Sequence, residues 1–312
     1  MGIFLTIDLG GTHIRAATFD KDSTRPLAHK KIATRSRHGA IYDRIEGLIA
    51  SIWPENDAVD AIGLASPGPL DPIRGVVLAT PNIPEWQNFP LGPKLSERFG
   101  VPVYMDNDAN LAALGEWRYG AGQGHQHVLY LTISTGIGGG VISHNRLLQG
   151  HHGLAAELGH VSVLAEGPIC SCGYPGHLEA LASGPAIVRY VREQLAAGAE
   201  SCLDPQDEFT AFQVAEAAMS GDALARSAYA RAGEFLGIGV ANFLHIFDPS
   251  IVIFGGGVSQ SGPLLFEPFE ASLHKRVFNP TYLENLTITT AALGDDAGLL
   301  GALALAHLSW AG

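Results

Sequence analysis

The chain has 312 residues, which is more than a single hydrophobic core usually organises, so two lobes are expected. Hydrophobic residues make up 46% of it and charged residues only 16%, a composition that excludes a disordered protein. The formal net charge of −12 disfavours nonspecific binding to nucleic acid or to an anionic membrane, and no apolar run is long enough to span a bilayer. An anionic substrate must therefore be held by local amides and a metal ion.

The first third of the chain predicts strands followed by a helix. Short apolar runs at 3–8, 14–19 and 26–33 are separated by turn residues, as in a meander. An apolar repeat of helical period covers roughly 40–53, and a further strand is expected at 60–65. This mixture of hairpins and crossover helices is typical of an α/β sheet that is covered on both faces.

A second series of elements begins near Val128 and repeats this plan. The strand VLYLTIS leads into a glycine turn at 136–140 and another strand. The expected elements that follow are helices near 185–197 and 222–246, a strand at 250–254, a helix at 263–276, a strand at 286–290 and a helix at 297–309. Two similar β-rich openings predict two related lobes. Periodicity alone also permits a doubly wound nucleotide-binding domain, but its G-x-G-x-x-G after the first strand and the G-x-x-x-x-G-K-[ST] loop are both missing.

Three glycine-rich turns follow strands and are candidates for phosphate binding. The first, DLGGT, runs from Asp8 to Thr12; the others are STGIGGG at 134–140 and FGGGVS at 254–259. Glycine lets backbone N–H groups approach a phosphate without obstruction by a side chain. The Thr12 hydroxyl can donate a hydrogen bond, and Asp8 can hold a magnesium ion through water. An ordinary hairpin or strand-to-helix connection is the alternative for each turn.

A candidate catalytic carboxylate lies between the strand VPVYM and the helical run NLAALGEWRYG. Asp108 falls near the N-terminus of that helix, where the helix dipole favours a carboxylate, so a helix cap is the alternative interpretation. A carboxylate within reach of an attacking hydroxyl can take its proton as general base. Asp106 is expected to be structural.

Four metal-ligand side chains occur within 18 residues. His160, Cys170, Cys172 and His177 form the pattern H-x9-C-x-C-x4-H, whose two thiolates and two imidazoles suit a closed zinc site. The alternative is that the cysteines are ordinary buried thiols and the histidines are incidental. Cys202 is the third and last cysteine and lies outside the cluster, so no disulfide framework is expected, and the setting is predicted to be reducing and cytoplasmic.

The segment 157–179, ELGHVSVLAEGPICSCGYPGHLE, resembles the signature of the ROK family of repressors, open reading frames and sugar kinases. In that signature E-x-G-H is followed by C-x-C-G-x-x-G-C-x-E, and His177 stands here where the family has its third cysteine. Glycines at 136, 138, 150 and 159 extend the similarity, and the pair Asn107-Asp108 coincides with the family's Asn-Asp pair. Motifs from Asp8 to Gly298 occur in the expected order.

The resemblance implies a two-lobed actin-like ATPase fold of the ribonuclease-H-like kind, with the active site in a central cleft. The expected lobes are residues 1–115 plus 300–312, and residues 116–299. The implied reaction transfers the γ-phosphoryl group of ATP to a sugar hydroxyl, with the 6-hydroxyl of glucose favoured. N-acetylglucosamine, N-acetylmannosamine, mannose and fructose are alternative acceptors. The expected cofactors are ATP, Mg²⁺ and structural Zn²⁺, and the expected assembly is a homodimer. Neither nucleic acid nor membrane is an expected partner.

The residues expected at the site fall into three groups. Asp108 is the expected general base, and the candidate sugar contacts are Gly68, Asn82, Asn107, Asp108, Glu157, His160 and Glu179. The expected nucleotide contacts are Asp8, Gly10, Gly11, Thr12, Thr135, Gly136, Gly256 and Gly257. The expected zinc ligands are His160, Cys170, Cys172 and His177, so that His160 has two roles. Trp86 is either a wall on the sugar side or a buried anchor.

Two classes of non-enzyme are alternatives. A sugar-sensing repressor of the same family would carry a helix-turn-helix segment before the first glycine turn, but the first strand is expected at residue 3, and the acidity of the chain disfavours DNA. An actin-like assembly protein would share the ATP-binding turns and have no use for a metal-stapled sugar loop. A kinase is therefore the favoured interpretation.

Overall fold

The computed structural model describes residues 2–35, 39–55, 58–79 and 83–310. It divides into two compact units, one made of Met1–His125, Gly140–Ala156 and Ala291–Gly312, and the other of Gln126–Gly139 and Glu157–Thr290. Relative to the boundaries expected from the sequence, this division assigns 116–125, 140–156 and 291–299 to the first unit. The functional lobe boundaries stay a prediction.

The first unit is built on a five-stranded sheet. Its strands are β1 (Ile3–Leu9), β2 (His13–Asp20), β3 (Pro26–Ala33), β4 (Val59–Ser66) and β8 (Val103–Asn107), in the order β3-β2-β1-β4-β8. Strands β1, β2 and β3 are antiparallel neighbours, whereas β4 is parallel to both β1 and β8. The strands expected at 3–8, 14–19, 26–33 and 60–65 are present to within a residue at each end.

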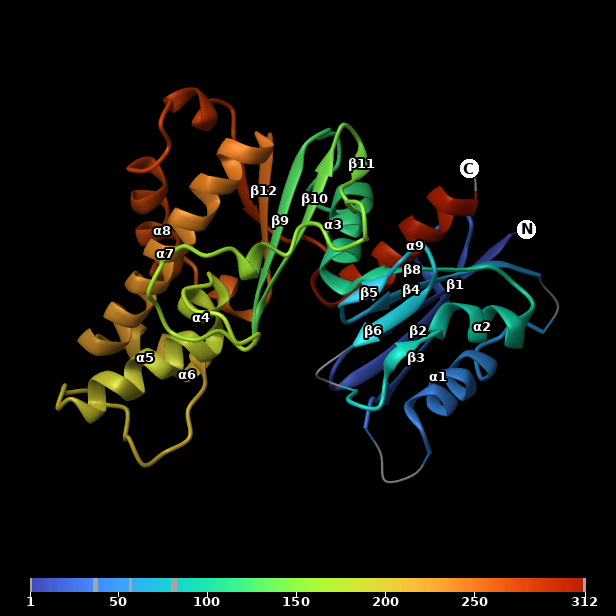
Figure 1. The fold of residues 1–312 in the computed structure, drawn as a ribbon, viewed down its shortest axis with the longest axis horizontal. Helices are drawn as coiled ribbons and strands as arrows, with labels where there is room; N and C mark the ends of the chain where they lie inside the picture. Colours follow the sequence, from blue (N-terminus) through green and yellow to red (C-terminus); the bar gives the residue numbers. More distant parts are fainter. Residues whose placement is uncertain (1, 36–38, 56–57, 80–82, 311–312) are drawn as a thin grey trace. The chain divides into compact units, whose positions relative to one another are not determined.

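Helices cover both faces of this sheet, because all seven residues of β1 are buried. Helices α1 (Ile41–Ala50) and α2 (Leu91–Phe99) pack on the face that presents Leu5 and Ile7 (Figure 1). Helix α9 (Ala297–Trp310) packs on the opposite face, against Phe4, and α3 (Asp108–Tyr119) runs beside α9. A Cβ at Gly301 would lie only 1.8 Å from the Leu111 carbonyl oxygen, so α3 and α9 touch through their backbones.

A small antiparallel sheet belongs to the same unit. It contains β5 (Leu70–Asp71), β6 (Val76–Ala79) and β7 (Gln87–Phe89), in that order. Trp86 precedes β7, is buried, and stacks on Phe89 with 4.6 Å between ring centroids. Trp86 is therefore a core anchor, which decides between its two interpretations.

The second large sheet repeats the plan of the first. It contains β9 (Val128–Ile133), β10 (Ile137–Ser143), β11 (Arg146–Leu147), β12 (Ile251–Gly255) and β13 (Thr287–Thr290), in the order β11-β10-β9-β12-β13. Strand β12 is parallel to both β9 and β13, and β10 is antiparallel to β11. Counted along the chain, both sheets have the order third, second, first, fourth, fifth, which agrees with the expected duplication.

The remaining helices belong mainly to the second unit. They are α4 (Glu179–Ala182), α5 (Gly184–Ala196), α6 (Ala211–Met219), α7 (Ala223–Phe247) and α8 (Pro263–His274), with 3₁₀ turns η1 (Leu158–His160), η2 (Gly257–Ser261) and η3 (Pro280–Leu283) in this unit and η4 (Gly294–Asp296) before α9. Helices α7 and α8 lie side by side (Figure 1). The sequence did not predict α2, α4 or α6. Among the residues described, none of the helices is both long and apolar enough to cross a membrane.

Candidate active site

The first glycine turn joins β1 to β2 and leaves its centre accessible. The Gly10 N–H donates to the His13 carbonyl over 2.9 Å, which closes the hairpin. The Thr34 hydroxyl donates to the Gly10 carbonyl over 2.6 Å and braces the turn from β3. Gly11 and Thr12 are exposed, so their backbone N–H groups can reach a ligand.

Asp8 is the second-to-last residue of β1, beside this turn, and forms an ion pair with Arg15. The carboxylate is 7% exposed, and Arg15 donates to its Oδ2 through Nε at 3.1 Å and also through Nη2. Arg15 also donates to the Asp295 carbonyl. Burial raises the pKa of the Asp8 carboxyl, while Arg15 opposes the increase. Arg15 was not among the residues expected at the site, although the hairpin register places it directly opposite Asp8.

The candidate general base begins helix α3. Asn107, the last residue of β8, is the N-cap, because its Oδ1 accepts from the Ala109 N–H at 2.9 Å. Asp108 is the first helical residue, and its Oδ1 also accepts from Ala109, at 2.8 Å. The helix thus has a cap other than Asp108. A Cβ at Gly68 would lie 2.9 Å from Asn107 Nδ2, so two of the predicted sugar contacts are neighbours. Asn82, another predicted contact, lies outside the described residues.

The four predicted metal ligands converge. One donor atom from each of His160, Cys170, Cys172 and His177 lies within 4.8 Å of all the others. The sulfur of Cys170 is 3.6 Å from Nδ1 of His160, and the sulfur of Cys172 is 3.2 Å from Nδ1 of His177. Tetrahedral zinc with bonds of about 2.3 Å to sulfur and about 2.0 Å to nitrogen would hold such atoms about 3.6 Å apart. The donor set and spacing therefore fit zinc.

The loop that carries these ligands folds back on itself. A bridge pairs Ser162 with His177, and a second pairs Ile169 with Pro175. Gly176 has φ +71°, and a Cβ there would lie 1.6 Å from the Leu164 carbonyl oxygen. The fold of the loop thus requires glycine at this position.

Glu179 joins the metal loop to the second glycine turn. Its Oε1 accepts from the Ser171 hydroxyl at 2.8 Å, and its Oε2 accepts from the Ile137 N–H at 3.0 Å. Ile137 lies within this glycine-rich segment and is the first residue of β10. A Cβ at Gly136 would lie 2.6 Å from Glu179 Oε2, so glycine at 136 makes room for the carboxylate.

Glu157 and His160 flank the turn η1 at the start of the metal loop. Glu157 is the more exposed of the two residues but is partly covered, and His160 is half-buried. The pKa of the Glu157 carboxyl is raised, mainly by partial burial. The charge of His160 lowers this pKa, and the charge of Glu179 raises it. Because His160 directs Nδ1 to the sulfur of Cys170, its Nε2 is available to a second partner.

The second and third glycine turns meet at the end of β9. Gly256 has φ +83°, and a Cβ there would lie 2.3 Å from the Ile133 carbonyl oxygen, so only glycine permits this approach. Thr135 from the second turn and Gly257 from the third line a common cavity of about 570 Å³. Gly136 and Gly256 are not among its lining residues. Two predicted nucleotide contacts thus share one cavity.

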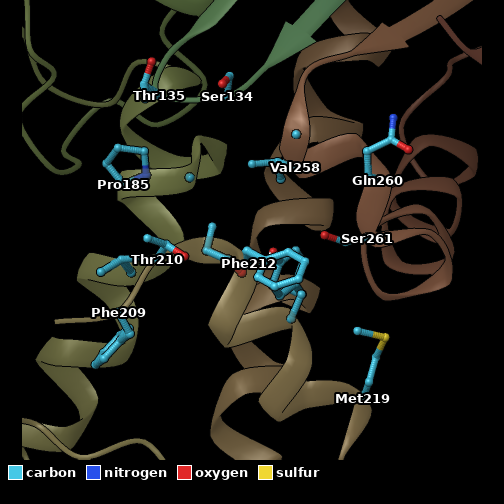
Figure 2. A pocket seen from close by; sticks show the side chains of 16 residues that line it. Ser134, Thr135, Pro185, Phe209, Thr210, Phe212, Met219, Val258, Gln260 and Ser261 are labelled. Carbon is cyan, nitrogen blue, oxygen red and sulfur yellow. Dashed lines mark hydrogen bonds between the residues drawn. The ribbon is translucent and has the colours of Figure 1, made fainter. Parts of the chain in front are cut away.

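The cavity is mainly apolar. Figure 2 shows Ser134 and Thr135 at one end and Phe209 and Met219 toward the other, with Phe212 between them. Phe212 and Met219 belong to α6, a helix that the sequence did not predict, so neither was expected at the site. The Tyr229 hydroxyl at the wall is already bonded to the Ala211 carbonyl, at 2.8 Å. The cavity therefore suits a flat, largely apolar group.

Two sheets of the same unusual order, each opening with a glycine-rich hairpin, define an actin-like ATPase of the ribonuclease-H-like class. The particular family follows from comparison with known proteins. The ROK family profile matches residues 4–309, and the chain belongs to that family.

The similar proteins cover almost the whole chain. The glucokinase of Thermotoga maritima is 37% identical over 305 residues, which are 96% of this chain and 95% of the relative. The crystal structure of a ROK hexokinase from Thermus thermophilus has 38% identity, a TM-score of 0.83 and 98% coverage of both chains. That of a ROK glucokinase from Streptomyces griseus in complex with glucose and AMPPNP has 37% identity and a TM-score of 0.79, covering 97% of this chain and 98% of the other. These neighbours confirm the predicted fold class.

Regulators are also similar to this chain. A xylose repressor from Caldicellulosiruptor bescii is 34% identical over 268 residues, which are 85% of this chain and 67% of the repressor. The similarity thus extends to both functional branches of the family. The glucokinase of Thermotoga maritima matches over a larger share of both chains than this repressor does.

Proposed function

We propose that this protein transfers the γ-phosphoryl group of ATP to the 6-hydroxyl of glucose. The chain is an ATP-dependent sugar kinase, because glucokinases match it from end to end at 35–37% identity and a glucokinase solved with glucose and AMPPNP shares its fold. The observation that carries the proposal is that end-to-end similarity combined with two glycine turns that border one cavity.

The nucleotide base is proposed to occupy the cavity beside Thr135 and Gly257. Its apolar walls would contact the faces of the base, and the sugar and phosphates would extend along the glycine turns. Gly136 and Gly256 would border the phosphates and the ribose. The first glycine turn, Gly10 to Thr12, would contribute N–H groups and a hydroxyl.

Magnesium is proposed to lie near Asp8. Oxygen donors are the ligands that this ion prefers, and because Mg²⁺ keeps several of its waters, one carboxylate is enough to hold it through water. When bound, the ion would neutralise charge on the phosphate oxygens. Asp8 serves this purpose as a carboxylate, and Arg15 favours that ionised form.

Asp108 is proposed to be the general base. Its carboxylate takes the proton of the sugar hydroxyl while the hydroxyl oxygen forms a bond to the γ-phosphorus. The bond from that phosphorus to the β–γ bridging oxygen breaks, and ADP leaves. Asn107 orients the sugar through its amide, and glycine at position 68 leaves room for that amide.

The sugar is proposed to bind to Glu157, His160 and Glu179 as well, with Asn82 as a further contact. Zinc held by His160, Cys170, Cys172 and His177 would fix the shape of this loop. In this arrangement His160 binds the metal through Nδ1 and a sugar hydroxyl through Nε2. Thiolate ligands require reduced cysteines, so a reducing cytoplasmic compartment is part of the proposal, as is a homodimer.

A coupled assay of ADP formation tests the function. Purified protein with ATP and magnesium is offered glucose, N-acetylglucosamine, N-acetylmannosamine, mannose and fructose. We expect the highest kcat/KM with glucose. A maximum with another sugar would replace glucose as the substrate, and no turnover combined with sugar binding in calorimetry would favour the regulator branch.

A further inference from the structure

The carboxylate of Asp106 is buried two residues before the proposed base. Asp106 lies in β8 and has no exposed surface. Its Oδ1 accepts from the Asn107 N–H at 2.7 Å and from Asn110 Nδ2 at 3.0 Å, and its Oδ2 accepts from Gln149 Nε2 at 2.6 Å. Three donors on one fully buried carboxylate are more than a cap or a strand needs, since a buried charge must be compensated by hydrogen bonds.

Two of these bonds fix the turn that carries Asn107 and Asp108. The bond to the Asn107 N–H holds the last strand residue, and the bond to Asn110 holds the first turn of α3 from inside. The Asn110 amide is oriented so that its Nδ2 faces the carboxylate. Its Oδ1 is buried and has no hydrogen-bond partner among the described residues. The amide thus leaves its acceptor unpaired in order to give its donor to the carboxylate.

The third bond connects the turn to a distant part of the same unit. Gln149 follows β11, and its carbonyl accepts from the Ala155 N–H at 3.1 Å, which closes the loop 149–155. The same loop is seated on the small sheet, because Gly153 packs against the ring of Pro72. Gln149 therefore holds Asp106 from a braced segment rather than from a free surface side chain.

The rest of α3 is fixed by backbone packing. A Cβ at Gly140 would lie 3.0 Å from the Ala109 carbonyl oxygen, so β10 presses on the first turn of the helix. Gly301 of α9 holds the next turn in the same way. With the body of the helix fixed, the bonds at Asp106 hold the backbone at its start, from which the Asn107 and Asp108 side chains project.

We propose that Asp106 is a positioning residue for the phosphoryl transfer, which acts by holding Asn107 and Asp108 through the bond network it shares with Asn110 and Gln149. The inference rests on the proposed role of Asp108 as general base. It assigns no chemistry to Asp106 itself, whose carboxylate is buried away from solvent and substrate.

The donor and acceptor pattern allows a test by exchange. Gln149→Met removes one donor and keeps the length of the side chain. Gln149→Glu places a second carboxylate against Asp106, so the two charges repel. In the double variant Asp106→Asn with Gln149→Glu, the new amide keeps one acceptor oxygen for Asn107 and Asn110 and offers its NH₂ group to the new carboxylate. The network is thereby rebuilt with the charge on the other partner.

The measured quantities are kcat, the KM for ATP, the KM for glucose, and Tm. A misplaced base loses rate without losing the nucleotide site, so we expect Gln149→Met to lower kcat roughly tenfold to a hundredfold with the ATP KM changed less than about twofold. Gln149→Glu should lower kcat further, and the kcat of the double variant should return to within about threefold of the wild-type value. Gln123→Met is the matched control, because the Gln123 amide donates to the Arg118 carbonyl on the exposed surface of the same unit.

Any of three results overturns the inference. The first is a kcat near wild type in both single Gln149 variants. The second is a double variant with a kcat no higher than that of Gln149→Glu. The third is a fall in kcat that only follows a fall in Tm and in ATP binding, which would assign Asp106 a role in folding. A failure of the proposed function would look different, because the wild-type protein would then turn over none of the sugars. In that case the variants can still be compared by their glucose affinity, measured by calorimetry.

Discussion

Substitution of Gly136 by alanine should weaken sugar binding through Glu179. A Cβ at this position would lie 2.6 Å from Glu179 Oε2, well inside an ordinary contact distance of roughly 3.5 Å. Because Gly136 is not in the left-handed region, the strain comes from this contact alone. The carboxylate must move, and the Ile137 N–H then loses its acceptor.

The expected magnitudes follow from these contacts. A buried donor without a partner costs about 1–3 kcal/mol, which is the expected loss in the free energy of unfolding. Hydrogen bonds to a charged group contribute about 1.5–3 kcal/mol, so displacing Glu179 from the sugar should raise the KM for glucose roughly 10-fold to 150-fold. If Gly136 served only the phosphates, the KM for ATP would rise instead.

Steady-state kinetics against both substrates and chemical denaturation measure these effects. Gly47→Ala is the matched control, because Gly47 lies in α1, away from the proposed site, and a Cβ there meets no atom within 4 Å. Glu179→Gln should produce a comparable rise in the KM for glucose, and the double variant should add little to it. A Gly136→Ala protein with wild-type stability and an unchanged KM for glucose would refute the reasoning.

Three further predictions concern the base, the metal and the pH dependence of stability. Asp108→Asn should lower kcat about a hundredfold to ten-thousandfold while glucose affinity in calorimetry stays near wild type; a kcat near wild type would show that another group takes the proton. Cys172→Ser should reduce the zinc content measured by elemental analysis and lower Tm, whereas Cys202→Ser, outside the metal loop, should change neither; equal zinc in both variants would exclude the site. Burial lowers the pKa of His307 in the folded state below its usual 6.5. Below pH 6.5 the unfolded state therefore binds more protons than the folded state, and the free energy of unfolding falls as the pH decreases toward the folded-state pKa. The variant His307→Phe can keep the edge contact with Phe4. It should reduce the slope of unfolding free energy against pH below pH 6.5, to which one proton contributes at most about 1.4 kcal/mol per pH unit. An unchanged slope would assign the titration to another group.

The sequence by itself determined the fold class and the pieces of the site that are local in the chain. The strand β12 is marked by a continuous apolar run, and helices such as α7 by their period, because burial imposes those patterns on neighbouring residues. The metal ligands are recognisable for the same reason, since His160 to His177 form a single loop whose spacing already limits its geometry. The glycine turns are marked by residues that only a tight turn or a close backbone approach requires.

Only the tertiary structure decided which polar atoms meet. Glu179 reaches the N–H of a residue 42 positions earlier, and Gln149 reaches a carboxylate 43 positions earlier. Helix α6, absent from the sequence prediction, supplies the wall of the cavity, and Trp86 proved to be a core anchor. Periodicity and propensity act over a few residues, whereas these contacts depend on how segments far apart in the chain pack together. That packing places a carboxylate against Gly136 and three donors on Asp106.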